Sequence, residues 1–91
     1  MKFRKNYIES NILQLAILEM LRMRNGKSFC PSEVVRWIYP CSWKYFMSDV
    51  QIEMMKLYRE DKIAVTQKGE LVSKDEIPSG PVRISKAGET L

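Results

Sequence analysis

A helical stretch in the middle of the chain carries the side chains whose types and spacing could do chemistry. Between Ser42 and Lys62, apolar residues recur at spacings of three and four, which gives a helix one face to bury. The opposite face carries cationic, hydroxyl and amide groups, which can neutralise phosphates and hydrogen-bond to base edges. We expect Asp49, Glu53 and Glu60 to lie on a third strip at the edge of the helix. The residues that we expect to contact nucleic acid are Lys44, Ser48, Gln51, Lys56 and Arg59 on this helix, with Lys68 and Arg83 following the nucleic-acid backbone.

Two other interpretations of this helix stay open. Its polar face could be the ordinary solvated surface of a small domain that binds nothing there. Alternatively, Ile52 and Met55 lie on the outward side beside Tyr45, and exposed methionine and aromatic side chains are typical of adaptable protein contacts. A protein partner or a homodimer, formed through these residues or through the first helix, is therefore the second functional hypothesis.

The sequence offers little for enzymatic chemistry. The chain has no histidine, which excludes His-based catalytic triads and His-containing zinc sites. Cys30, at an expected helix N-terminus close to Lys27, is the only plausible nucleophile, and no histidine can serve as its base. Lys27 follows Gly26 without the glycine-rich lead of a phosphate-binding loop. We therefore expect no enzyme, no catalytic residue, no cofactor and no metal.

The composition limits the classes of protein to which the chain can belong. The chain has 91 residues, enough for one domain, and its 45% hydrophobic and 29% charged residues are typical of a folded globular protein. A net charge of +4 fits a polyanionic partner such as DNA, with RNA as a further option. No apolar run is long enough to span a bilayer and no signal peptide is recognisable, so we expect a cytoplasmic protein without membrane contact. Two cysteines are too few for a disulfide framework and fit a reducing compartment.

The elements that must position the candidate residues begin with a long helix from residue 7 or 8 to Arg24. Its apolar arc is wide, and a second copy of the chain could pack against it. We expect its buried face to consist of Ile8, Ile12, Leu15, Ala16 and Met23, widened by Leu13, Ile17, Met20 and Leu21. Asn25-Gly26 ends this helix, because glycine readily adopts the left-handed cap conformation. Residues 27–29 form a short connection that could add a stub strand to a sheet.

A second, short helix is expected at residues 31–38. It starts with Pro31 at the first helical position and Glu33 in the first turn, and Pro40 stops it. Ser42 can then cap the third helix. We expect that helix to bury Trp43, Phe46, Val50, Met54 and Leu57, and we expect Trp37 to lie in the core or at its edge.

Strand-like segments follow the third helix. Residues 63–67 are short and β-branched, Lys68-Gly69 is a turn, residues 70–73 could pair back, and Val82 and Ile84 share a face of a segment at 81–85. The expected fold is therefore α+β: a winged helix-turn-helix with three helices and a small antiparallel β-hairpin wing. A three-helix bundle with a disordered tail is the alternative.

We expect one domain over residues 1–91 with its core at 8–86, and flexible ends at 1–6 and 87–91. The basic N-terminus could alternatively be an arm that touches nucleic acid.

Several motifs resemble, in order along the chain, a small bacterial family known as domain of unknown function thirty-two fifty-three. They are Gly26-Lys27, Cys30-Pro31-Ser32-Glu33-Val34, Trp43, Ile63-x-Val65-Thr66-Gln67-Lys68-Gly69 and Gly80-Pro81-Val82-Arg83-Ile84. The resemblance covers about residues 8–86 and implies a compact winged helix without an assigned activity, so it transfers no catalytic or ligand-binding residue. The third helix is more apolar and aromatic here, at Tyr45, Phe46, Ile52, Met54 and Met55, than the resemblance leads us to expect. Whether its outer face meets nucleic acid or protein therefore stays open.

Overall fold

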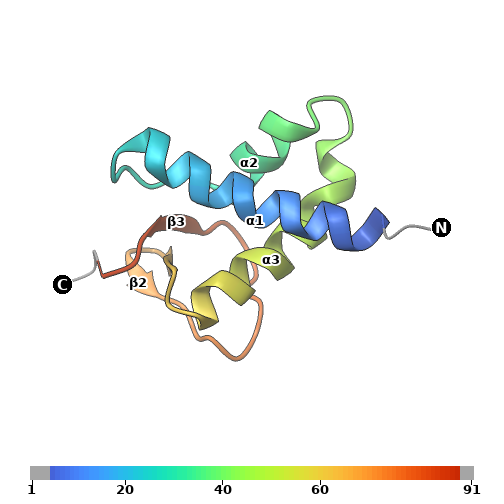
Figure 1. Cartoon of the computed structure of the whole chain (residues 1–91). Helices are drawn as coiled ribbons and strands as arrows, with labels where there is room; N and C mark the ends of the chain where they lie inside the picture. The colour runs from blue at the N-terminus through green and yellow to red at the C-terminus, as the bar shows by residue number, and fades with distance from the viewer. Residues whose placement is uncertain (1–4, 89–91) are drawn as a thin grey trace.

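Three helices and a small antiparallel sheet make up the protein, as the sequence predicts for an α+β fold (Figure 1). The computed structural model describes the backbone of residues 5–88 and the side chains of residues 12–88. The elements are α1 (Lys5–Arg24), α2 (Pro31–Ile38), the 3₁₀ helix η1 (Trp43–Phe46), α3 (Met47–Arg59), β1 (Ile63–Gln67), β2 (Glu70–Leu71) and β3 (Arg83–Lys86). Most of the termini that we expected to be flexible lies outside the described residues, but Lys5 and Asn6 belong to α1.

Helix α1 crosses the middle of the molecule, with α2 on one side and α3 and the sheet on the other (Figure 1). The face that it buries differs from the expected one. Buried are Leu13, Ala16, Ile17 and Met20, whereas Ile12, Leu15 and Met23 are exposed, and the side chain of Ile8 lies outside the described ones. The apolar arc is wide enough to allow two rotational settings. Packing against α2 and α3 selects the setting centred on Ile17.

The connection from α1 to α2 joins the helices to the sheet. Asn25 and Gly26 both adopt left-handed conformations, with φ values of 56° and 92°, so the helix ends where the sequence predicts. Phe29 then forms the expected stub of strand. Its N–H donates to the carbonyl oxygen of Ile84 at 3.0 Å, and the Ile84 N–H donates back at 2.7 Å.

Helix α2 begins as the sequence predicts, with Pro31 in its first position and Cys30 as the cap residue. The Glu33 carboxylate accepts a hydrogen bond from the Cys30 N–H at 3.0 Å and another from Arg24 at 2.5 Å. The Cys30 N–H first, and then the Arg24 guanidinium, hold the pKa of Glu33 below its usual range. Val34 and Val35 form the buried face of α2, while Trp37, expected in the core or at its edge, is 47% exposed.

The third helix starts with a tighter turn than expected. Residues 43–46 form η1, whose cap residue Ser42 makes no side-chain cap hydrogen bond, and α3 then ends at Arg59 rather than at Lys62. The expected inner face is confirmed: Val50, Met54 and Leu57 are buried, and Trp43 and Phe46 pack partly buried against the core. Two neighbouring expectations are wrong, because Met55 and Glu53 are also buried. Contacts with α1, α2 and β1 cover α3 around most of its circumference.

The sheet has three strands in the order β2-β1-β3, where a two-stranded hairpin was expected. β1 pairs antiparallel with both neighbours, Thr66 lying opposite Leu71 on one side and opposite Arg83 on the other. Lys68 and Gly69, with φ values of 54° and 84°, form the predicted two-residue turn. Val82 and Ile84 are buried on one face, as predicted.

Candidate nucleic-acid interface

The outward surface of η1 and α3 holds five of the seven expected contact residues. In a 3₁₀ helix, residues three apart share a face, so Trp43 and Phe46 turn inward together while Lys44 and Tyr45 point outward. Lys44 and Ser48 are exposed and Gln51 is half-buried. Because α3 buries so much of its circumference, its outward side is a narrow strip that consists of Ser48, Asp49, Ile52, Lys56 and Arg59.

Three of the expected cationic contacts already have partners within the protein. The Lys56 ammonium lies 3.3 Å from the buried Glu53 carboxylate. Arg59 donates from Nε to the carbonyl oxygen of Lys74 at 2.8 Å. Arg83 donates to the hydroxyl and the carbonyl oxygen of Ser28 at 3.1 and 2.9 Å. These side chains hold α3, the loop after β2 and strand β3 in place, which leaves them fewer donors for a ligand.

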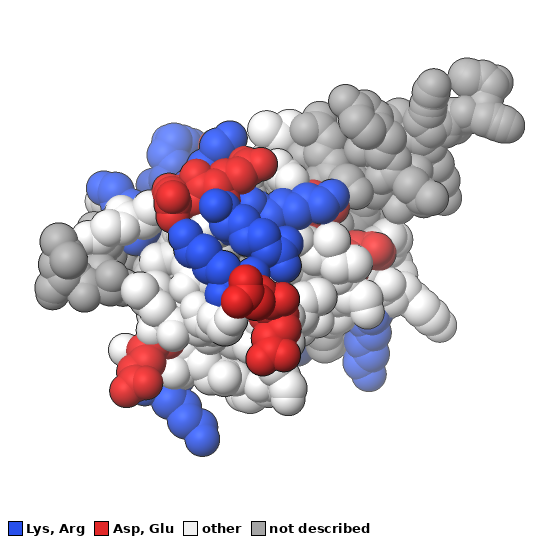
Figure 2. All heavy atoms as spheres, turned by 90° about the horizontal axis from the view of Figure 1, so that it is seen from below, with Lys and Arg blue, Asp and Glu red and all other residues white. Residues whose placement is uncertain are grey.

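The wing, residues 63–86, has mixed charge with a small basic excess. Lys68 is exposed at the β1–β2 turn, and the wing holds four Lys and Arg against three Asp and Glu. Figure 2 shows basic side chains gathered near the middle of one face, with acidic side chains beside them on two sides. Ion pairs of this mixed kind join Lys74 to Asp61 at 2.5 Å and Lys62 to Glu60 at 3.5 Å. A polyanion would meet both signs of charge over this part of the chain.

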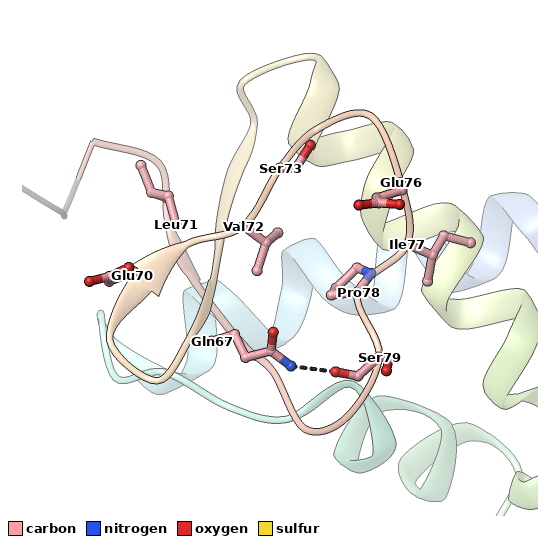
Figure 3. Close-up of a pocket in the computed structure, with 9 residues that line it drawn as sticks. All are labelled: Gln67, Glu70, Leu71, Val72, Ser73, Glu76, Ile77, Pro78 and Ser79. Atoms are coloured by element: carbon pink, nitrogen blue, oxygen red, sulfur yellow. Dashed lines mark hydrogen bonds between the residues drawn. The ribbon is translucent and has the colours of Figure 1, made fainter.

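A hollow of about 480 Å³ lies between the β1–β2 hairpin and the loop that follows it (Figure 3). Gln67 spans its base, donating from Nε2 to the carbonyl oxygens of Ser79 at 2.5 Å and Pro81 at 3.2 Å. The lining residues are Gln67, Glu70, Leu71, Val72, Ser73, Glu76, Ile77, Pro78 and Ser79. This lining contains two carboxylates and no cationic side chain, so it does not suit a phosphate group.

The surface where α2 meets η1 carries cationic and aromatic side chains instead of carboxylates. The guanidinium carbon of Arg36 lies 4.1 Å from the centre of the Trp43 ring, and the Lys44 nitrogen lies 5.8 Å from it. The rings of Tyr39, after α2, and Phe46, in η1, stack with their centres 3.9 Å apart. Residues 34–48 contain no acidic residue at all. We name Arg36, Trp43, Lys44 and Tyr45 the aromatic corner.

The sequence indicated Lys44 as a contact residue and Tyr45 as an outward residue beside Ile52, but it did not indicate Arg36. The signal that could have indicated Arg36 is the acid-free run of residues 34–48, which carries five of the nine aromatic residues of the chain. These residues come together in space only because the turn at Pro40 brings the end of α2 against η1. Periodicity within a single helix does not indicate such a contact between two elements.

A comparison with known protein families gives a match over most of the chain. A family model described as protein of unknown function (DUF3253) matches residues 10–87. The chain belongs to this family. The span agrees with the resemblance that the sequence motifs indicate, and it includes all seven expected contact residues and the aromatic corner. No curated protein matched the DUF3253 chain.

The DUF3253 chain also has an apolar groove of about 380 Å³ between α1 and α2. Leu15 is 58% exposed there, and Glu19 at its edge is paired with Arg22 of the same helix. The lining residues are Ile12, Leu15, Ala16, Glu19, Trp37 and Ile38. Of the two side chains expected to form a protein contact on α3, Ile52 is 42% exposed but Met55 is fully buried. Exposed apolar side chains therefore gather on α1 and α2, and Met55 adds none to the surface of α3.

The remaining candidates for chemistry in this DUF3253 domain are few. Cys30 is half-buried, and its sulfur lies 3.2 Å from the Ser32 hydroxyl. Among the described residues, no three His, Cys, Asp or Glu side chains are grouped so that they could hold a metal ion. None of the helices within residues 5–88 combines the length and the apolar character that crossing a membrane would need.

Proposed function

We propose that this chain is a nucleic-acid-binding module of the winged helix-turn-helix type. Its order of helix, stub strand, helix, turn, helix and antiparallel sheet is compatible with that architecture, in which the helix after the turn approaches the ligand. The contact surface consists of η1 and the first turns of α3, with Lys44, Ser48 and Gln51 from the expected set. Both cysteines are unpaired, as in proteins of a reducing compartment, so we place this function in the cytoplasm.

One observation carries the proposal: the charges of the chain are unevenly distributed. Residues 34–48 hold Arg36 and Lys44 without any acidic residue, whereas residues 49–80 carry more acids than bases. Lys44 and Arg36 are both exposed and rest on the Trp43 ring, so each can reach a phosphate without first breaking an ion pair within the described residues. Binding to a phosphate backbone depends on such uncompensated cations.

Hydrogen-bonding groups lie next to these cations. The Ser48 hydroxyl is exposed in the first turn of α3, and the Gln51 amide is one turn farther along and half-buried. A hydroxyl or an amide at this position can accept or donate a bond to a base edge or a phosphate oxygen. Asp49 lies beside them and is exposed, so it repels a phosphate placed too far toward the middle of α3. The contact is therefore centred on η1.

A salt series tests the proposal. Fluorescence anisotropy with labelled oligonucleotides between about 50 and 200 mM salt should show an affinity that falls steeply, because counterions leave the phosphates on binding. Replacing Lys44 by alanine should reduce the slope of log K against log salt by about 0.7–0.9. Lys62→Ala is the matched control, because Lys62 is paired with Glu60 on the mixed-charge surface and its loss should leave the slope unchanged. No binding to either single-stranded or duplex oligonucleotides would refute nucleic-acid binding.

Self-association through the groove between α1 and α2 is the second candidate function. The exposure of Leu15 and Trp37 beside a groove lined mostly by apolar groups favours it, and the Glu19–Arg22 pair adds no net charge that would repel a second copy. We expect the sedimentation coefficient to rise with protein concentration. Leu15→Glu should abolish this rise, whereas Leu71→Glu, at a similarly exposed position on the sheet, should preserve it. A concentration-independent monomer would eliminate this candidate.

A further inference from the structure

Tyr45 is the most exposed large hydrophobic side chain among the described residues, at 84%. Its chain neighbour Lys44 and Arg36 of α2 both lie over the ring of Trp43, two residues before Tyr45. An aromatic ring that is nearly free of protein contacts exposes its apolar faces to water, which is unfavourable. A flat ligand that covers the ring would remove this cost.

The ring is attached to a rigid support. The Tyr45 N–H donates to the Ser42 carbonyl oxygen at 3.0 Å, and its neighbours Trp43 and Phe46 pack against the core. Phe46 in turn stacks on Tyr39 with an angle of 14° between the rings. Tyr45 therefore projects from an ordered turn rather than from a loose loop, and little backbone entropy is lost when a ligand covers it.

We infer that Tyr45 stacks on an unpaired nucleobase while Arg36 and Lys44 contact the neighbouring phosphates, so that the site takes single-stranded nucleic acid. This inference rests on the proposed function and specifies its substrate class. Aromatic rings next to cations are the shared feature of sites that bind single strands, because every unpaired base has a free face to stack on. In a duplex those faces are covered by the adjacent base pairs.

The rest of α3 supports a single strand over a duplex. Reading the major groove needs a helix face with several free donors and acceptors. The outward strip of α3 instead carries Ser48 alone as a free neutral donor, beside Asp49 and Ile52, while Lys56 and Arg59 are held by Glu53 and by the loop after β2. The wing, which would follow the backbone of a duplex, has mixed charge. What remains for a ligand is the aromatic corner, with Ser48 and Gln51 in the first turns of α3 beside it.

The test compares one sequence in different strand states. A labelled, non-self-complementary strand of about a dozen nucleotides, matched to the size of known single-strand sites, is titrated as DNA, as RNA and as the DNA duplex. Wild-type protein should bind at least one single strand more tightly than the duplex, and the DNA and RNA arms distinguish the two sources of unpaired bases. Tyr45→Leu should weaken single-strand binding by about 5- to 150-fold, the range expected for the loss of one stacked base. Its effect on duplex binding should be small.

Tyr45→Phe keeps the ring and should bind single strands nearly as well as the wild type, whereas Leu71→Ala controls for the loss of an exposed apolar side chain elsewhere. Folding is not at risk, because the Tyr45 side chain is almost fully exposed. Equal affinity for single strands and duplex, or an unchanged single-strand affinity of Tyr45→Leu, would overturn the inference and leave nucleic-acid binding intact. Preference for the duplex would have the same consequence. Absence of binding to all three probes would overturn both.

Discussion

Replacing Phe29 by alanine should lower the free energy of unfolding by about 3–5 kcal/mol. The Phe29 ring is fully buried in the core, and its backbone N–H and C=O both pair with Ile84. Truncation would therefore leave a cavity at the point where the connection between α1 and α2 meets the sheet. A domain of this size has a total stability of about 5–15 kcal/mol, so the variant would lose a large fraction of it.

Urea denaturation followed by tryptophan fluorescence measures this effect, since Trp37 and Trp43 report on the helices. Phe29→Leu is the matched control and should retain much of the lost stability, because it refills most of the volume. The pairing with Ile84 involves only backbone atoms, so both variants keep it. A loss below about 1.5 kcal/mol for Phe29→Ala would mean that the site collapses around the smaller side chain and that the ring is not central to the core.

Local signals in the sequence predict most of the fold. Pro31 and Glu33 locate the start of α2, Asn25 and Gly26 locate the end of α1, and Lys68-Gly69 locates the tight turn between β1 and β2. Each of these depends on backbone preferences within a few residues. Strand β2 is harder to predict than β1 and β3, because it is only two residues long and the turn before it decides its pairing.

The rotational setting of a helix depends on its neighbours, and here the sequence is ambiguous. α1 is apolar around much of its circumference, so Ile12 and Leu15 were expected inside and lie outside. On α3, periodicity correctly identifies Val50, Met54 and Leu57 as buried but does not reveal that Met55 is buried too. A helix covered on several sides has a wider buried face than any single stripe indicates.

The candidate site was predictable only in part, for the same reason. Lys44, Ser48 and Gln51 lie at the surface near the expected place, but the expected set did not include Arg36. Arg36 is eight residues from Lys44 in the chain, and they meet over Trp43 only because the turn after α2 folds back. The partners of Arg59 and Arg83, Lys74 and Ser28, are 15 and 55 residues away from them. Contacts at such separations follow from the tertiary fold.

Glu53 is the clearest case of a tertiary contact that reverses a sequence expectation. Its position on α3 places it at the edge of the apolar face, yet it is only 3% exposed. Gln14 of α1 donates from Nε2 to one carboxylate oxygen at 2.7 Å, and Lys56 reaches the other at 3.3 Å. A buried carboxylate needs such partners, because burial without them costs several kcal/mol. Gln14 therefore joins α1 to α3 through a charged hydrogen bond.

Replacing Gln14 by leucine should lower the free energy of unfolding by about 1.5–3 kcal/mol, the usual cost of removing a hydrogen bond to a buried charge. Glu53→Met should cost less, because Gln14 is half-buried and its amide can turn toward water. Combining both substitutions replaces the polar pair by two apolar side chains that can pack on each other. Because no buried charge is then left without a partner, the double variant should be more stable than Gln14→Leu alone.

Urea denaturation of the four proteins in a double-mutant cycle measures the coupling between Gln14 and Glu53. Arg22→Leu serves as a control on α1, since its ion pair with Glu19 is exposed to solvent and should contribute little to stability. Additive effects of the two substitutions would contradict the structure, because residues that share a buried hydrogen bond must show a coupling energy. A favourable coupling energy would show that Gln14 of α1 stabilises the buried carboxylate of Glu53 in α3. The hydrogen bond between α1 and α3 would then explain how α3 can bury an acidic residue.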